Sequence, residues 1–278
     1  MRTLPSDPVA DTVESRTDTV SALERGISVL RCFSLERPML GYAEIAKMTG
    51  IPRPTVNRLV GTLLAAGMLK PALIADRFTL GPALVALSRV FLGSLDVRAL
   101  ARPRMQAMAD DLSASVYLAV RDGMEMVMIE ACRPVASILS PRLDVGSRAP
   151  MPTSALGRAY LSALGDGLRT QLTDSLRLLR GPEWERIGPA MERAIHEAKG
   201  LGYCLSLGEF HHEINSVSVP LVGPGDEIFA LNCGGAAYVF TEERLRQEFA
   251  PRLRRVAQEI ARDIGGHVPL TLTEQPQS

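Results

Sequence analysis

The stretch YAEIAKMTGIPRPTVNRLVGTLLAAGML, residues 42–69, decides the fold of the N-terminal part of the chain. It predicts a short helix, a turn centred on Gly50 and a second helix, which is the layout of a helix-turn-helix DNA reader. In the second helix apolar residues recur at helical spacing, which predicts a buried face. This face consists of Val56, Leu59, Val60, Leu63 and Leu64. The opposite face is polar and should stay exposed.

The ends of this second helix carry their own signals. Pro54 stands in its first turn, where a missing N–H costs nothing, and Gly67 is placed to end it. An earlier helical stripe contains Leu23, Ile27 and Leu30 and should pack against it. Residues 68–69 and 78–80 can pair as two short strands, which would form the wing of a winged helix-turn-helix.

Charge is distributed unevenly. The whole chain has 31 Lys and Arg and 31 Asp and Glu, but residues 20–80 contain eight Lys and Arg against four Asp and Glu. A local cationic excess is typical of a nucleic-acid-binding domain. We predict that the exposed face of the second helix and the wing contact double-stranded DNA through Arg53, Thr55, Asn57, Arg58, Thr62 and Arg77.

Length and composition favour several domains. At 278 residues and 46% hydrophobic residues, the chain can bury two ordinary cores. We predict a disordered tail over 1–19, a winged helix-turn-helix over 20–81, a linker helix over 82–96 that a partner subunit would cover, a sensor domain over 97–267 and a second tail over 268–278. No signal peptide or membrane-spanning run is found in the sequence, which predicts a cytoplasmic protein with no membrane partner.

The larger C-terminal part combines strands and helices. Asp122-Gly123 lies between two β-type runs and predicts a hairpin over 115–129. Helical patterns follow near 155–164 and 184–199, strands near 202–207, 215–222 and 228–232, and a closing helix from Thr241. This order predicts an α+β domain with an antiparallel sheet flanked by helices.

Three segments together resemble the isocitrate-lyase-regulator (IclR) family of bacterial transcription factors: residues 44–69, VGSRAPMPTSALGRAYLSAL at 145–164, and GYCLSLGEFHHEINSVSVPL at 202–221. The resemblance covers about residues 20–266 and implies an N-terminal winged helix-turn-helix, a dimerising linker helix and a GAF-like or profilin-like effector domain. It also implies a homodimer or a dimer of dimers that represses or activates transcription. Pro54 replaces a frequent Ser, Asn57 replaces a frequent His, and the wing tip lacks the usual Asp-Gly turn.

A pocket for a small organic acid is predicted in the C-terminal domain. Thr153-Ser154 can cap a helix that begins at Ala155, so that its first N–H groups are available to an anion. The resemblance implies that the effector lies against Ala155, Leu156, Ser206, Ile214, Ser216, Asn232 and Gly234. Glu209, in the titratable cluster of residues 209–213, completes the predicted set.

Three alternatives stay open at this stage. The cluster that contains His211 and His212 could hold a metal with Cys204 or Cys233, although its spacing does not require one, and we predict no metal and no cofactor. A Cys/His hydrolase is the weakest alternative, because the sequence has none of the common catalytic motifs. A cytoplasmic sensor that acts through protein contacts is the third.

Overall fold

The computed structural model describes residues 20–134 and 143–271, and it separates into two compact units that divide between Gly93 and Ser94. The predicted tail over 1–19 lies outside the described residues, as does the end of the predicted C-terminal tail. Thr271, which we placed in that tail, is only 3% exposed. Among the described residues, no helix has the length and apolar character needed to cross a bilayer.

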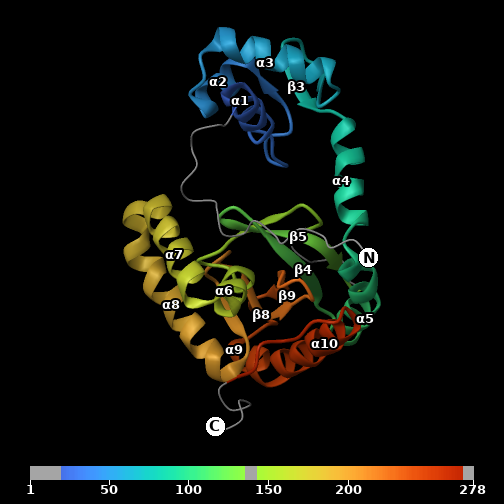
Figure 1. Cartoon of the computed structure of the whole chain (residues 1–278), viewed down its shortest axis with the longest axis vertical. Helices are drawn as coiled ribbons and strands as arrows, with labels where there is room; N and C mark the ends of the chain where they lie inside the picture. The colour runs from blue at the N-terminus through green and yellow to red at the C-terminus, as the bar shows by residue number, and fades with distance from the viewer. Residues whose placement is uncertain (1–19, 135–142, 272–278) are drawn as a thin grey trace, which may run out of the picture. The chain divides into compact units, whose positions relative to one another are not determined.

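The N-terminal unit is a winged helix-turn-helix (Figure 1). Its helices are α1 (Ser21–Leu30), α2 (Tyr42–Thr49), α3 (Arg53–Ala65) and α4 (Ala83–Gly93). Its three-stranded antiparallel sheet has the order β1-β3-β2, with β1 (Leu40–Gly41), β2 (Leu69–Pro71) and β3 (Arg77–Leu80). The two strands of the predicted wing are confirmed, and β1 is an addition that the sequence did not indicate.

The turn between α2 and α3 depends on a glycine. Gly50 ends α2 with φ +69°, a left-handed conformation that residues with a Cβ adopt at a cost. Pro54 lies in the first turn of α3, as predicted. Val56 and Val60 of α3 are fully buried against Val29 and Ile45, so the polar side of α3 is left facing outward.

Helix α4 follows the wing and has no buried residue. Its exposed apolar side chains include Val85 at 71%, Leu87 at 55% and Val90 at 73% exposure. Exposing such a surface to water is unfavourable, because the free energy of the system falls when apolar area is covered.

The C-terminal unit is built on a six-stranded antiparallel sheet of order β6-β5-β4-β9-β8-β7. The strands are β4 (Ser115–Asp122), β5 (Glu125–Cys132), β6 (Arg148–Pro150), β7 (Cys204–Leu207), β8 (Ile214–Val222) and β9 (Ile228–Ala236). The predicted α+β class is confirmed. Strand β6 and helix α7 had not been predicted.

Helices cover this sheet (Figure 1). They are α5 (Asp96–Leu112), α6 (Ala155–Ala163), α7 (Asp166–Arg180), η1 (Gly181–Glu183), α8 (Trp184–Leu201), α9 (Glu242–Arg244), the π-helical turn η2 (Leu245–Phe249) and α10 (Ala250–Asp263). Thr241 caps the closing helix, as its sequence position indicated. Helix α6 packs on β8 and β9, and its N-terminus meets the sheet where the cavity described below opens.

Candidate DNA-reading face and effector cavity

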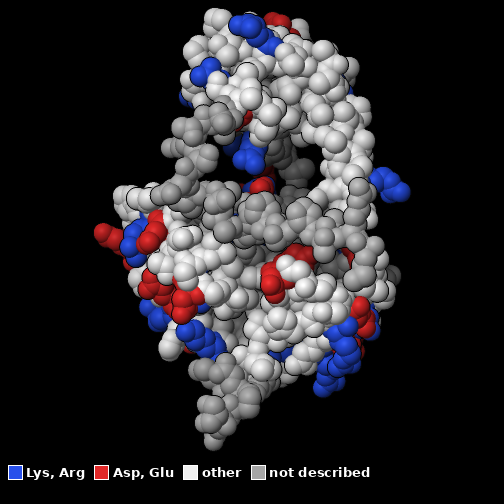
Figure 2. Space-filling view, viewed as in Figure 1, with Lys and Arg blue, Asp and Glu red and all other residues white. Residues whose placement is uncertain are grey.

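The outward face of α3 carries the predicted DNA contacts. Arg53, Asn57, Arg58 and Thr62 are exposed, while Thr55 is half-buried. The hydroxyl of Thr62 donates to the carbonyl of Arg58 at 3.1 Å, so it is occupied within the helix. In Figure 2 the visible blue patches over the N-terminal unit have few red neighbours, whereas blue and red alternate over the C-terminal unit.

Arg77 differs from the other predicted DNA contacts. Its guanidinium donates to the carbonyl of Met39 at 3.2 Å and to the carboxylate of Glu44 at 3.3 Å. Glu44 in turn accepts from the backbone N–H of Gly41 at 2.8 Å. Arg77 thus joins the wing to α2, and this structural role was not visible in the sequence.

A cavity opens at the N-terminus of α6 and is framed by β4, β8 and β9. Six predicted effector residues line it: Ala155, Leu156, Ile214, Ser216, Asn232 and Gly234. Seven further residues line the cavity and had not been predicted from the sequence: Tyr117, Met128, Leu143, Ala149, Ser154, Phe210 and Gly235.

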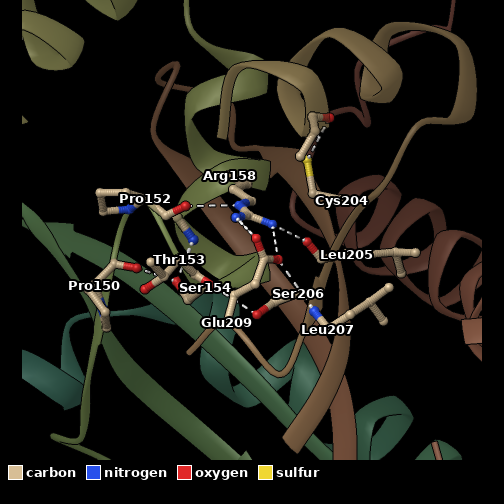
Figure 3. A network of polar contacts seen from close by, with 12 residues as sticks. Pro150, Pro152, Thr153, Ser154, Arg158, Cys204, Leu205, Ser206, Leu207 and Glu209 are labelled. Atoms are coloured by element: carbon tan, nitrogen blue, oxygen red, sulfur yellow. Dashed lines mark hydrogen bonds and ion pairs between the residues drawn. The ribbon is translucent and has the colours of Figure 1, made fainter. Parts of the chain in front are cut away.

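The N-terminus of α6 gives the cavity its polar end. The Ser154 hydroxyl accepts from the Gly157 N–H at 3.1 Å and donates to the Pro150 carbonyl at 2.7 Å (Figure 3). The Ala155 and Leu156 N–H groups belong to the first turn, where a helix offers no acceptor of its own. Both residues line the cavity, so the N-terminal end of α6, where a helix favours negative charge, lies at its wall.

A phenol forms another polar point on the cavity wall. The side chain of Tyr117 is buried and lines the cavity. Burial raises the pKa of Tyr117 above its usual value, and the nearby Ser115 and Arg133 only partly oppose the effect. The phenol therefore stays protonated near neutral pH.

Two predicted effector residues lie outside the cavity lining. Ser206 is 1% exposed and its hydroxyl donates to the Thr153 carbonyl at 2.7 Å (Figure 3). Glu209 accepts two hydrogen bonds, at 2.6 and 2.7 Å, from the buried guanidinium of Arg158. Arg158 also donates to the carbonyls of Pro152 and Leu205, at 2.9 and 2.8 Å.

The Arg158–Glu209 pair connects α6 to the segment after β7. Phe210, the next residue after Glu209, lines the cavity. The pair therefore holds the segment that carries Phe210 against α6. A lone Arg within the apolar sequence of α6 was the available signal for this network.

The alternative metal site is not assembled. Among the residues that the structure describes, no three His, Cys, Asp or Glu side chains are grouped closely enough to hold a metal ion. His211 and His212 stack on each other with ring centroids 4.9 Å apart, whereas the Cys204 thiol contacts the Ala194 carbonyl of α8.

The cysteines also lack the properties of catalytic nucleophiles. All four are buried free thiols. Burial raises the pKa of Cys204 to about 12 and that of Cys132 to about 11, and it raises the pKa of Cys233 as well. Since the thiolate is the reactive form, these side chains are poor nucleophiles at neutral pH.

Comparisons with known proteins agree with both units. The family model for the bacterial transcriptional regulator IclR C-terminal domain matches residues 90–262, and that for the IclR helix-turn-helix domain matches residues 22–72. The HTH-type transcriptional regulator TsaQ1/TsaQ2 of Comamonas testosteroni is 29% identical over 249 residues, which cover 89% of each chain.

Solved structures show the same fold. An IclR family transcriptional regulator from Brucella abortus is 35% identical, with a TM-score of 0.83 over 90% of this chain and 95% of that one. An IclR homologue from Microbacterium hydrocarbonoxydans in complex with 4-hydroxybenzoate shares the fold at 24% identity, with a TM-score of 0.69 over 88% and 99% of the two chains. This chain is therefore a member of the IclR family of bacterial transcriptional regulators.

Proposed function

We propose that α3 binds operator DNA and that a small organic acid in the cavity at α6 regulates this binding. The observation that carries the proposal is the cavity itself, which offers the N-terminal donors of α6 and the Tyr117 hydroxyl within a largely apolar wall. A carboxylate would meet the helix N-terminus, and an apolar or aromatic body would contact Met128, Leu156 and Phe210. The protein would act in the cytoplasm, without catalysis or a resident cofactor.

A panel of small organic acids, including 4-hydroxybenzoate, tests the cavity by thermal shift. A ligand at 100 times its Kd stabilises the folded state by about 2.7 kcal/mol. We expect at least one acid to raise the melting temperature and to change the affinity for DNA selected by the full-length protein. If none of the acids did so, the proposed effector class would be rejected.

Changing Arg58 to alanine is expected to weaken DNA binding by about 1–3 kcal/mol if the guanidinium contacts a base edge. Arg58 is exposed on α3, and within the described part of the chain its guanidinium has no hydrogen-bond or ion-pair partner, so its loss should leave unfolding unchanged. Gel shifts at fixed salt measure the effect. Arg25→Ala on α1 is the matched control, since it removes one exposed cation of the same unit outside α3. If both variants bound DNA with equal affinity, Arg58 would not be a specific contact of the DNA interface.

We also propose that the chain is a homodimer or a dimer of dimers in which a second copy covers α4. The exposed apolar residues Val85, Leu87 and Val90 provide the driving force for this contact. Effector binding would then favour one of two dimer geometries, which differ in the spacing of the two α3 helices. The shift in the equilibrium between these geometries can be no larger than the difference in the effector's affinity for them.

Replacing Val90 by glutamate is expected to shift the protein toward monomers, because it places a charge on the apolar face of α4. Light scattering after size-exclusion chromatography measures the mass. Leu178→Glu is the control, since Leu178 is 84% exposed on α7, outside the proposed interface. An unchanged mass for Val90→Glu would exclude α4 as the dimer contact.

A further inference from the structure

The tip of the wing is apolar and exposed. Between β2 and β3 the chain reads Ala72-Leu73-Ile74-Ala75-Asp76. Leu73 is fully exposed, at 106% of its reference area, and Ile74 is 56% exposed. Exposing two adjacent branched apolar side chains to water is unfavourable, and neither side chain is buried in the core of the unit, where it would stabilise the fold.

The turn that presents these side chains is well defined by hydrogen bonds. The N–H of Ala72 donates to the Arg77 carbonyl at 2.9 Å, and the N–H of Arg77 donates to the Ile74 carbonyl at 3.3 Å. Asp76 adopts a left-handed conformation with φ +55°, which turns the chain back into β3.

The base of the wing is fixed to the rest of the unit. Phe78 of β3 is 5% exposed, and its ring packs edge-on against Tyr42 with centroids 4.8 Å apart. Arg77 is bonded to Met39 and Glu44, as described above. Leu73 and Ile74 therefore stand on a supported hairpin, and binding them costs little conformational entropy.

The surroundings of the tip indicate duplex DNA as the occupant. The wing follows α3 directly in the chain and packs against it, so the tip continues the face proposed to contact DNA. Exposed Lys70 precedes the tip, and the only carboxylate in the wing is that of Asp76. Two side chains offer too little area for a protein interface, which needs about 800 Å² from each partner.

The chemistry of the tip also restricts what it can do on DNA. From Pro71 to Ala75 no side chain carries a hydrogen-bond donor or acceptor. These residues cannot read base edges by hydrogen bonds. Leucine and isoleucine are, however, among the side chains that proteins insert between base pairs from the minor groove, and the small Ala72 and Ala75 on either side suit a narrow groove.

We propose that Leu73 and Ile74 enter the minor groove beside the α3 site as an apolar wedge that partly unstacks one base step and bends the duplex. The inference rests on the proposed DNA-binding function and adds a mode of recognition to it. Since pyrimidine–purine steps unstack most easily, the wedge would select a TA or CA/TG step that no side chain contacts by hydrogen bonds.

The test uses the full-length protein and duplexes that it selects from a random pool. End-labelled duplexes report bending by energy transfer, and 2-aminopurine at the flanking step reports unstacking. The variant Leu73→Ser/Ile74→Ser should bend the duplex less, lose the 2-aminopurine signal and bind about tenfold more weakly. Its salt dependence should equal that of the wild type, because no phosphate contact has been removed.

Leu35→Ser is the matched control, since Leu35 is 86% exposed in the same unit but lies between α1 and β1. It should behave as the wild type. If the wild type bound no selected duplex, the proposed function would fail. If it bound but the double variant bent and unstacked the duplex equally, only the wedge would be overturned.

Two other results would also overturn the wedge. Deoxyuridine lacks the thymine methyl group in the major groove and leaves the minor groove unchanged. If deoxyuridine weakened binding of the wild type but not of the double variant, the tip would contact thymine methyls instead. If the double variant changed only the oligomeric mass, the tip would be a contact between copies of the chain.

Discussion

Glu209→Gln is expected to destabilise the C-terminal unit by about 2–3 kcal/mol, which is less than the roughly 3–5 kcal/mol lost when a fully buried ion pair is broken. Arg158 is 3% exposed, and the Glu209 carboxylate is the anion that its guanidinium contacts. Glutamine can still accept one hydrogen bond but leaves a buried positive charge without its partner. The one-third exposure of the Glu209 side chain reduces the cost, because water already screens the carboxylate.

Denaturant unfolding measures this loss, with Glu213→Gln as the matched control. Glu213 is four residues further on, and its side chain is 74% exposed. We expect its change to stay within about 0.5 kcal/mol, as for other surface substitutions. Equal unfolding midpoints for Glu209→Gln and the wild type would show that Arg158 does not depend on this carboxylate.

The same variant separates two roles for Glu209. Glu209 was predicted from the sequence to contact the effector directly, whereas in the structure its carboxylate contacts Arg158 and the next residue, Phe210, lines the cavity. A direct contact would lower effector affinity without changing stability. A positioning role would change both, because the segment that carries Phe210 loses its attachment to α6.

The helices and turns of the helix-turn-helix could be predicted closely because their signals are local, but the predicted buried stripe of α1 was wrong. Leu23 and Ile27 are 65% and 43% exposed, and Val29 is the buried side chain. The buried face of α3, Pro54 in its first turn and Gly67 after its end all lie within a few residues of the feature that they determine. The same holds for the β4–β5 hairpin, whose turn contains Gly123 at φ +62°. Short strands such as β1 have too few residues for a periodic pattern, so they were missed.

Pairing between side chains that are far apart in the chain was the second feature that could not be predicted from the sequence. Arg158 and Glu209 are 51 residues apart, and nothing in either neighbourhood identifies the partner. Arg77 was interpreted as a DNA contact because a cation on a wing has that use, yet its pairing with Glu44 depends on how β3 packs beside α2. Helix α7 buries only Leu172 and Leu176, so its apolar stripe is narrow and its pattern was overlooked.

Gly157→Ala is expected to abolish the effector-dependent thermal shift and to destabilise the C-terminal unit by about 1–3 kcal/mol or more, as for other overpacked sites. A Cβ on Gly157 would lie 2.2 Å from the Met151 Cα and 2.4 Å from the Met151 carbonyl oxygen. Both are backbone atoms, so no rotamer change relieves the clash. The first turn of α6 must move, and the Ala155 and Leu156 N–H groups move with it.

Thermal shift with the most stabilising acid of the panel measures this effect, and Gly200→Ala is the matched control. A Cβ on Gly200, in α8, meets nothing within 4 Å, and alanine there should stabilise the helix by about 0.5–1 kcal/mol. Because the helix-turn-helix is a separate compact unit, Gly157→Ala should still bind selected DNA in the cold without effector. A normal effector response in Gly157→Ala would mean that the donors at the start of α6 do not hold the acid, and the proposed site would have to be abandoned.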